Sequence, residues 1–169
     1  LSKEIPLEEV VITATKVNES TPVAYSELGK NKLKQLNNGQ GIPSLIQQSP
    51  SVTTTSDAGT GIGYSGFRIR GTDANRINIT VNGVPMNDSE SHTVFWVNLP
   101  DFASSVENIQ IQRGVGTSTN GAAAFGATVA MQTQKSELKP SAEYSISAGS
   151  FSTIKNMVKV GTGLLKDHF

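Results

Sequence analysis

The chain has 169 residues, 14 of them basic and 14 acidic, so its formal net charge at pH 7 is zero. A balanced charge gives no long-range field toward nucleic acid or an anionic membrane surface, and the sequence contains no nucleic-acid-binding motif. The absence of cysteine excludes disulfides, thiol catalysis and cysteine-ligated zinc. The 16 glycines and the apolar fraction of 36% favour a loop-rich β protein over a helical bundle.

The N-terminal segment has the composition of an extended arm. Residues 1–9 are charged and contain Pro6, and residues 16–22 resemble a linker. Between them, the run VVITAT at 10–15 is β-branched but has no neighbour close in sequence with which to pair. We therefore expect an unpaired arm in front of the folded domain. The alternative is that residues 10–15 form a strand of that domain's sheet.

Short elements follow the arm. Residues 23–28 predict a short strand, and residues 29–41 begin with helix formers and end with Asn and Gly. Pro43 stands near the start of a second short helix at 42–48, and residues 49–55 return to extended chain. Two short helices are therefore expected between extended segments.

The central strands carry two arginines that need an explanation. The segment FRIR at 67–70 and the segment INITV at 77–81 alternate like half-buried strands, with a turn at 71–76 between them. Arg68 and Arg70 would then share one face of the first strand. If protein covers that face, each guanidinium needs a carboxylate partner.

Long loops separate the remaining strands. The loop at 56–66 is polar and rich in glycine, and the loop at 84–101 combines polar residues with Phe95 and Trp96. Further elements are a turn of helix at 100–109, strands at 109–113 and 127–134, and a Gly/Ala-rich stretch at 114–126.

The tail changes character. Residues 141–149 and 153–163 alternate apolar and polar side chains over roughly 10 residues each, which is typical of transmembrane barrel strands. A soluble hairpin is the alternative, because it produces the same alternation. No run reaches the length of about 18 apolar residues that a membrane helix needs.

No constellation of catalytic or metal-binding residues is recognisable. The glycines at 61–66 satisfy a dinucleotide fingerprint, but a strand follows them where a helix is required. His92 and His168 lack the spacing of a metal pair. We therefore expect no enzyme, no cofactor, no metal site and no catalytic residue. The loop acids also match no calcium loop: Asp57, Asp73, Asp88 and Glu90.

Three segments, in this order, resemble one family, the plug domain of TonB-dependent outer-membrane receptors. Residues 8–16 (EEVVITATK) resemble a TonB box, residues 67–88 resemble the Arg-Gly and Asp-Gly signature, and residues 106–135 resemble the closing signature. The departures are mild: Asn82 for Asp, Val115 for Pro, Phe125 for Tyr, and VAMQTQK for the common Val-Ile-Asn ending.

The resemblance implies an α+β fold, a small mixed sheet with short surrounding helices, followed by a hairpin from a truncated transmembrane β-barrel. It divides the chain into a periplasmic arm with the TonB box at 1–21, a plug at 22–137, and the first barrel strands at 138–169. The expected location is the outer membrane, with the plug inside its own barrel and the arm facing the periplasm. The chain would then be a piece of a longer receptor.

The resemblance also implies roles for particular residues. The TonB energy-transducing protein would bind the arm by strand addition. Arg70 and Arg113, each followed by glycine, would pair with carboxylates of the barrel wall, whereas Arg68 matches a variable position and would be a surface or wall contact. The alternative is that all three arginines are solvated. The TonB-box residues would be Glu9, Val10, Val11, Ile12, Thr13 and Ala14.

The expected function is gating of energised uptake of a scarce large ligand. An iron-siderophore complex is the family's commonest cargo, while cobalamin, haem and oligosaccharide remain open. The loops at 56–66, 86–98 and 115–122 are candidate apices. The competing class is a non-transport envelope β-domain, such as an adhesin or a carbohydrate-binding module. The ligand-binding candidates are Tyr64, His92, Phe95 and Trp96, the last with burial in the plug core or against the wall as its alternative.

Overall fold

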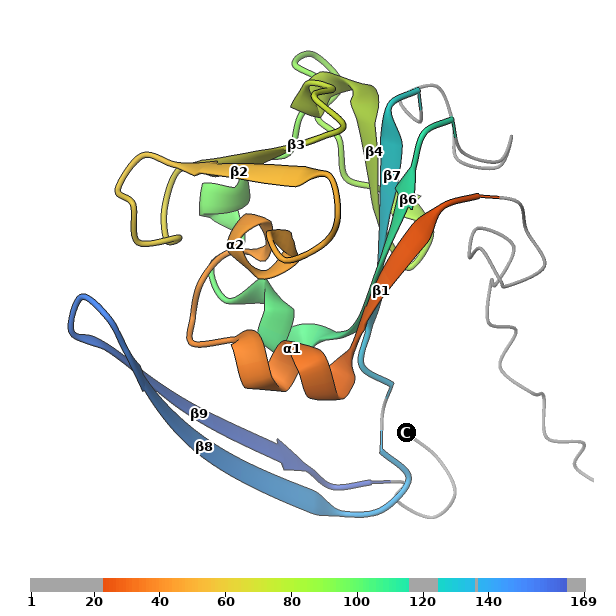
Figure 1. The fold of residues 1–169 in the computed structure, drawn as a ribbon. Helices are drawn as coiled ribbons and strands as arrows, with labels where there is room; N and C mark the ends of the chain where they lie inside the picture. Colours follow the sequence, from red (N-terminus) through yellow and green to blue (C-terminus); the bar gives the residue numbers. More distant parts are fainter. Residues whose placement is uncertain (1–22, 116–124, 136, 164–169) are drawn as a thin grey trace, which may run out of the picture.

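A computed structural model describes residues 23–115, 125–135 and 137–163. Its largest unit is a five-stranded sheet in the order β1-β6-β7-β4-β5, in which β4 and β7 run parallel and the other neighbours run antiparallel (Figure 1). This arrangement confirms the predicted small mixed sheet with short helices. The strands are β1 (Tyr25–Gly29), β4 (Ile77–Val81), β5 (Val84–Pro85), β6 (Val106–Arg113) and β7 (Ala127–Thr133).

The alternation of apolar and polar residues along these strands produces one apolar face. Ile77 and Ile79 of β4 are fully or almost fully buried, as are Ile109 and Ile111 of β6. Burying a side chain of this size contributes about 1.5–3 kcal/mol. The apolar face therefore anchors the rest of the domain. Side chains from the other elements complete its core: Leu33, Ile42, Leu45, Ile46, Phe67, Ile69 and Trp96.

The helices are short and cover this core. Helix α1 (Lys30–Leu36) ends where the backbone N–H of Asn37 bonds to the Leu33 carbonyl, and Gly39 then takes a φ of 99°. Helix α2 (Ile42–Ile46) has proline in its first turn, and its four apolar side chains are buried. Both lie inside the ranges predicted for them. The 3-10 turns are η1 (Ala74–Arg76), η2 (Trp96–Asn98) and η3 (Phe102–Ser105).

Among the described residues, no helix has the length and apolar character needed to span a membrane. The five-stranded sheet departs from the sequence-based expectation at β6 and at β5. Strand β6 starts at Val106, three positions before 109, because η3 ends at Ser105 and the chain extends at once. The short strand β5 lies within the predicted loop at 84–101, because an Asn82-Gly83 turn folds the chain back on β4.

Strands β2 (Val52–Ser56) and β3 (Ser65–Ile69) form a separate hairpin that lies over α2 (Figure 1). The expectation that Arg68 and Arg70 share a strand face is wrong, because β3 ends at Ile69 and Arg70 turns into the left-handed region with a φ of 52°. Arg68 forms an exposed ion pair of 3.1 Å with Asp73, within the same domain.

The tail forms a third sheet, the hairpin of β8 (Ser141–Gly149) and β9 (Thr153–Gly161), paired antiparallel along its whole length. It lies beside α1, apart from the five-stranded sheet (Figure 1). Alternate residues face in opposite directions, so one face carries polar side chains toward the domain. The other face exposes large apolar side chains to the surroundings: Tyr144, Ile146, Ile154, Val158 and Val160.

Candidate functional site

The second and third segments of the family resemblance meet at one end of the three central strands, β6, β7 and β4. The backbone N–H of Gly126 bonds to the Arg76 carbonyl at 2.9 Å, and the N–H of Gly114 bonds to the Gly126 carbonyl at 2.9 Å. The Arg70 guanidinium lies close by, with Nη1 3.3 Å from the position that a Cβ on Gly114 would take. Residues distant in sequence thus form one junction.

Gly126 is required at this junction by close approach of the backbone. A Cβ at this position would lie 2.3 Å from Thr72 Cγ2 and 3.0 Å from the Arg76 carbonyl oxygen. Neither contact leaves room for a side chain, so any larger residue would push the two segments apart. The glycine of the closing segment therefore fixes the spacing between β7 and the turn after β3.

The two arginines that precede glycine differ in their contacts. The Arg113 guanidinium donates hydrogen bonds to the Ser26 hydroxyl and, at 3.2 Å, to the Tyr25 carbonyl, which holds it against β1. The Arg70 side chain is exposed and forms no hydrogen bond or ion pair with any other described residue. Of the two, Arg70 is therefore the one whose guanidinium is open to solvent.

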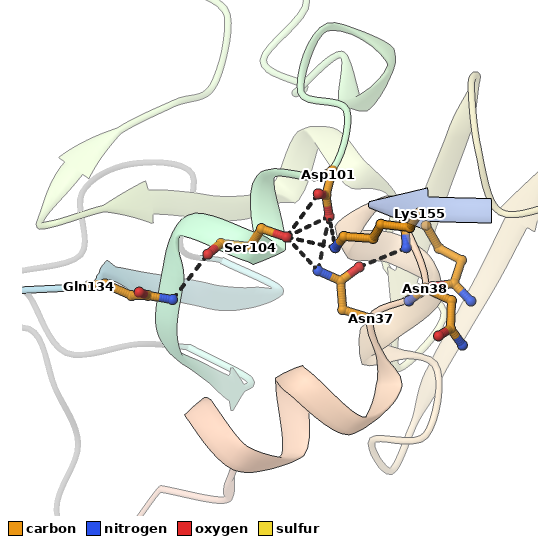
Figure 2. A network of polar contacts seen from close by, with 8 residues as sticks. Asn37, Asn38, Asp101, Ser104, Gln134 and Lys155 are labelled. Carbon is orange, nitrogen blue, oxygen red and sulfur yellow. Dashed lines mark hydrogen bonds and ion pairs between the residues drawn. The ribbon is translucent and has the colours of Figure 1, made fainter. Parts of the chain in front are cut away.

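A polar network connects the domain to the β8–β9 hairpin (Figure 2). Lys155 of β9 donates hydrogen bonds of 2.7 Å each to the Asp101 carboxylate and to the Ser104 hydroxyl. The Asn37 amide donates to the same two groups at 2.9 and 3.1 Å. Because the Lys155 side chain is only 12% exposed, its charge depends on Asp101 for compensation.

Two further contacts flank this network along the hairpin. Lys34 of α1 forms an ion pair of 2.6 Å with Glu143 of β8, and Lys159 of β9 donates a hydrogen bond to Gln134. A cavity of about 110 Å³ lies between them, with Ser145 among its lining residues. The polar face of the hairpin therefore contacts the domain through ion pairs and hydrogen bonds around a small cavity, and not through a packed apolar interface.

Three of the four candidate ligand-binding side chains are exposed, namely Tyr64, His92 and Phe95. Trp96 is 5% exposed, and its ring packs against Phe67 with centroids 5.8 Å apart. The core alternative therefore describes the position of Trp96, and its ring is out of a ligand's reach in this conformation. The TonB-box residues, and most of the candidate loop at 115–122, lie outside the described residues.

Sequence reasoning missed Asp101 and Lys155, and also Asn87, whose side-chain amide bonds to the backbone of Ile77 and Ile79 in β4. The alternation in 153–163 indicated that Lys155 faces the polar side of its strand, but nothing marked its partner, because Asp101 stands in an irregular turn with a φ of 49°. Asn87 gave no signal either. Among the described residues, no group of three potential metal ligands is present.

A family model, the TonB-dependent Receptor Plug Domain, matches residues 17–128. This chain belongs to that family. The match includes the junction, the two arginine-glycine pairs and the loop that carries His92, and it ends just after β7 begins. No curated protein sequence matches the chain.

Solved receptor structures share this plug fold. The pyoverdine receptor FpvA of Pseudomonas aeruginosa superimposes with a TM-score of 0.68 at 16% identity, covering 88% of this chain and 19% of its own. The siderophore receptor PirA of Acinetobacter baumannii gives 0.57 at 25% identity, covering 79% and 21%. The copper transporter OprC gives 0.63 at 15% identity, covering 83% and 22%. The plug chain thus spans about a fifth of these receptors.

The Asp101 carboxylate provides a pH-dependent test of the network. Burial raises the pKa of Asp101, but hydrogen bonds from Lys155, Asn37 and Ser104 outweigh it, so the pKa lies below its ordinary value of 3.8. A lowered pKa means that the network's contribution is complete above about pH 4 and is lost as the pH falls through the lower folded value.

We expect Asp101→Asn to lower the free energy of unfolding by about 1–2 kcal/mol at pH 7, with allowance for partial exposure, because Lys155 loses its counter-charge. Thermal or denaturant unfolding of the chain at several pH values measures this. The difference from the unsubstituted chain should shrink below pH 4. Asp73→Asn is the control, since that ion pair with Arg68 is exposed on both sides and should cost little. Equal losses in the two variants would contradict the role of the network.

Proposed function

We propose that this chain is the plug, with the first wall hairpin, of an outer-membrane receptor that gates energised uptake of an iron-siderophore complex. The observation that carries the proposal is the two-faced β8–β9 hairpin, whose polar face is bonded to the plug while its apolar face is exposed. A barrel strand that separates an internal plug from lipid needs this division. The domain limits would be an arm at 1–21, the plug at 22–137 and the wall from 138.

The proposed ligand class rests on the likeness to siderophore receptors. PirA, named as a siderophore receptor, reaches 25% identity, whereas OprC, named as a copper transporter, is similar in fold alone at 15%. Tyr64, His92 and Phe95 supply exposed aromatic and hydrogen-bonding groups that suit a large polar complex. Binding of ferric siderophores to the full-length receptor, with copper ion as the competing cargo, tests the ligand class.

Transport through a plugged barrel requires that something pull on the plug. In this proposal the TonB energy-transducing protein binds Glu9 to Ala14 by strand addition. Val10, Val11, Ile12 and Thr13 are β-prone, and backbone hydrogen bonds would transmit the force.

Val11→Pro removes a backbone donor from the proposed added strand. In the full-length receptor we expect it to abolish energised uptake of a bound ferric siderophore while leaving the affinity for that ligand unchanged. Radiolabelled iron uptake and equilibrium binding measure the two quantities separately. Lys3→Pro, outside the proposed box, is the matched control. Undiminished uptake by Val11→Pro would move the TonB contact to another segment.

Arg70 and Arg113 would contact the barrel wall in the complete receptor. The exposed Arg70 is the stronger candidate, because Arg113 already bonds to Ser26 and Tyr25. Without Arg70, a wall carboxylate would lose a charge-assisted hydrogen bond in the partly desolvated space between plug and barrel.

Arg70→Ala should therefore leave the unfolding free energy of the 169-residue chain almost unchanged and cost about 1–3 kcal/mol in the receptor. Arg113→Ala serves as comparison, since it should destabilise both forms through the bonds to β1. Denaturant unfolding of each protein gives the values. A loss at Arg70 that is equal in chain and receptor would show that its partner lies within the plug.

A plug that must move during transport can be tested by tying it to the wall. The Cβ of Asn38, next to α1, lies 3.9 Å from the position of a Cβ on Gly149 at the end of β8. This separation is within the range of disulfides, and the chain has no other cysteine.

The double variant Asn38→Cys/Gly149→Cys should therefore oxidise readily and block energised uptake until a reductant is added, because the bond joins plug to wall. The control is Ser141→Cys/Gly161→Cys, which joins facing residues of the same hairpin and leaves the plug free. Iron uptake before and after reduction is the measurement. Full uptake by the oxidised plug–wall variant would mean that this side of the plug stays in place during transport.

A further inference from the structure

Strand β4 has an incomplete edge. Its partner β5 supplies only two residues, which pair with Thr80 and Val81. Beyond them the Met86 N–H bonds to the Ile79 carbonyl at 2.8 Å, and the chain then leaves the sheet. The Ile79 N–H and the Ile77 carbonyl are therefore left without a partner in β5, although both residues are buried.

The side chain of Asn87 provides those partners. Its Oδ1 accepts the N–H of Ile79 at 2.8 Å, and its Nδ2 donates to the Ile77 carbonyl at 2.9 Å. One side-chain amide thus occupies the place of a peptide group in a neighbouring strand. The second Nδ2 hydrogen is donated to the His92 carbonyl at 2.9 Å. Asn87 therefore connects β4 to His92, five residues further along the loop.

The loop beyond Asn87 is closed on itself. The Asp88 N–H bonds to the Thr93 carbonyl and the His92 N–H bonds to the Asp88 carbonyl, both at 2.9 Å. The Asp88 carboxylate accepts the Ser91 N–H at 2.8 Å and the Glu90 N–H at 3.1 Å. His92 takes a φ of 55°, which turns the chain back. The tip is thus a compact unit whose side chains are exposed, apart from the half-buried Thr93.

We propose that Asn87 is the positioning residue of a ligand-recognition tip formed by residues 88–93. The amide fixes this unit to β4 and so sets the direction in which His92 and its neighbours meet the ligand. The tip presents hydroxyl, carboxylate and imidazole groups, which suit a ligand with many hydrogen-bonding groups, as ferric hydroxamate and catecholate complexes have. This inference rests on the proposed function.

Only a side-chain amide of this length fits the role. Aspartate has the same shape as asparagine but lacks both donors, so it would direct a carboxylate at the Ile77 and His92 carbonyls. Asn87→Asp therefore removes the connection without leaving a cavity. Asn98→Ala is the matched control, because Asn98 is exposed in the same long loop and its side chain bonds to no other described residue.

The first experiment needs no ligand. Amide hydrogen exchange of the full-length receptor should be at least about tenfold faster at Ser91, His92 and Thr93 in Asn87→Asp, the effect of losing two hydrogen bonds. The amides between β4 and β7 should keep their protection, which separates loss of positioning from unfolding of the sheet. Asn98→Ala should exchange as the unsubstituted receptor does. Unchanged exchange at the tip in Asn87→Asp overturns the proposal.

The second experiment tests recognition with ferric pyoverdine, a ferric trihydroxamate and a ferric triscatecholate as probes. For a complex that binds, His92→Ala and Asn87→Asp should each weaken affinity about tenfold, and the double variant should lose no more than the larger single loss. Additive losses, or full affinity in Asn87→Asp, overturn the positioning role. If no probe binds the unsubstituted receptor, the proposed ligand class fails, and the exchange result still decides the role of Asn87.

Discussion

The parallel pairing of β4 with β7 is the constraint on which the rest of the plug depends. Two parallel strands cannot be joined by a tight turn, so the chain from residue 82 to 126 must cross from the end of one to the start of the other. That crossover carries the His92 loop, η2, η3 and β6. It also returns at Gly126, where the backbone meets Arg76 and Gly114. The loops are therefore positioned by a pairing that is buried on its apolar face.

Much of this fold could be predicted from residue pattern, because burial imposes periodicity. The strands around Ile77 and Ile109 alternate clearly, and the two tail strands do so over their full length. Segment order then supported the family. What pattern could not provide was the end of β3, since nothing in FRIR indicates that Arg70 leaves the strand. Most residues other than glycine avoid the left-handed conformation that Arg70 adopts. Tertiary contacts, and not local preference, therefore set it.

The candidate site was harder to predict for the same reason. Trp96 stands between Phe95 and Val97 in a long loop without strand alternation, yet it packs on Phe67 from the hairpin that covers α2. The side chain of Asn87 bonds to backbone groups of β4 that no neighbouring strand reaches. This role is visible only when the surroundings of the Ile79 N–H and the Ile77 carbonyl are known. Asp101 acquires its meaning from a lysine on a separate sheet. In each case the partner is distant in sequence and no periodicity connects the two.

The Asp101–Lys155 pair has a consequence for modularity. Its acid belongs to the plug and its base to the β8–β9 hairpin, so the proposed boundary near residue 137 would separate two halves of one ion pair. Plugs exchanged between receptors at that boundary would bring together an acid and a base that arose in different proteins. A chimera with a neutral residue opposite Lys155 would leave a poorly hydrated cation between its plug and its barrel. If the hairpin belongs to the barrel wall, compatibility between a plug and a foreign barrel would thus depend partly on a single matched charge.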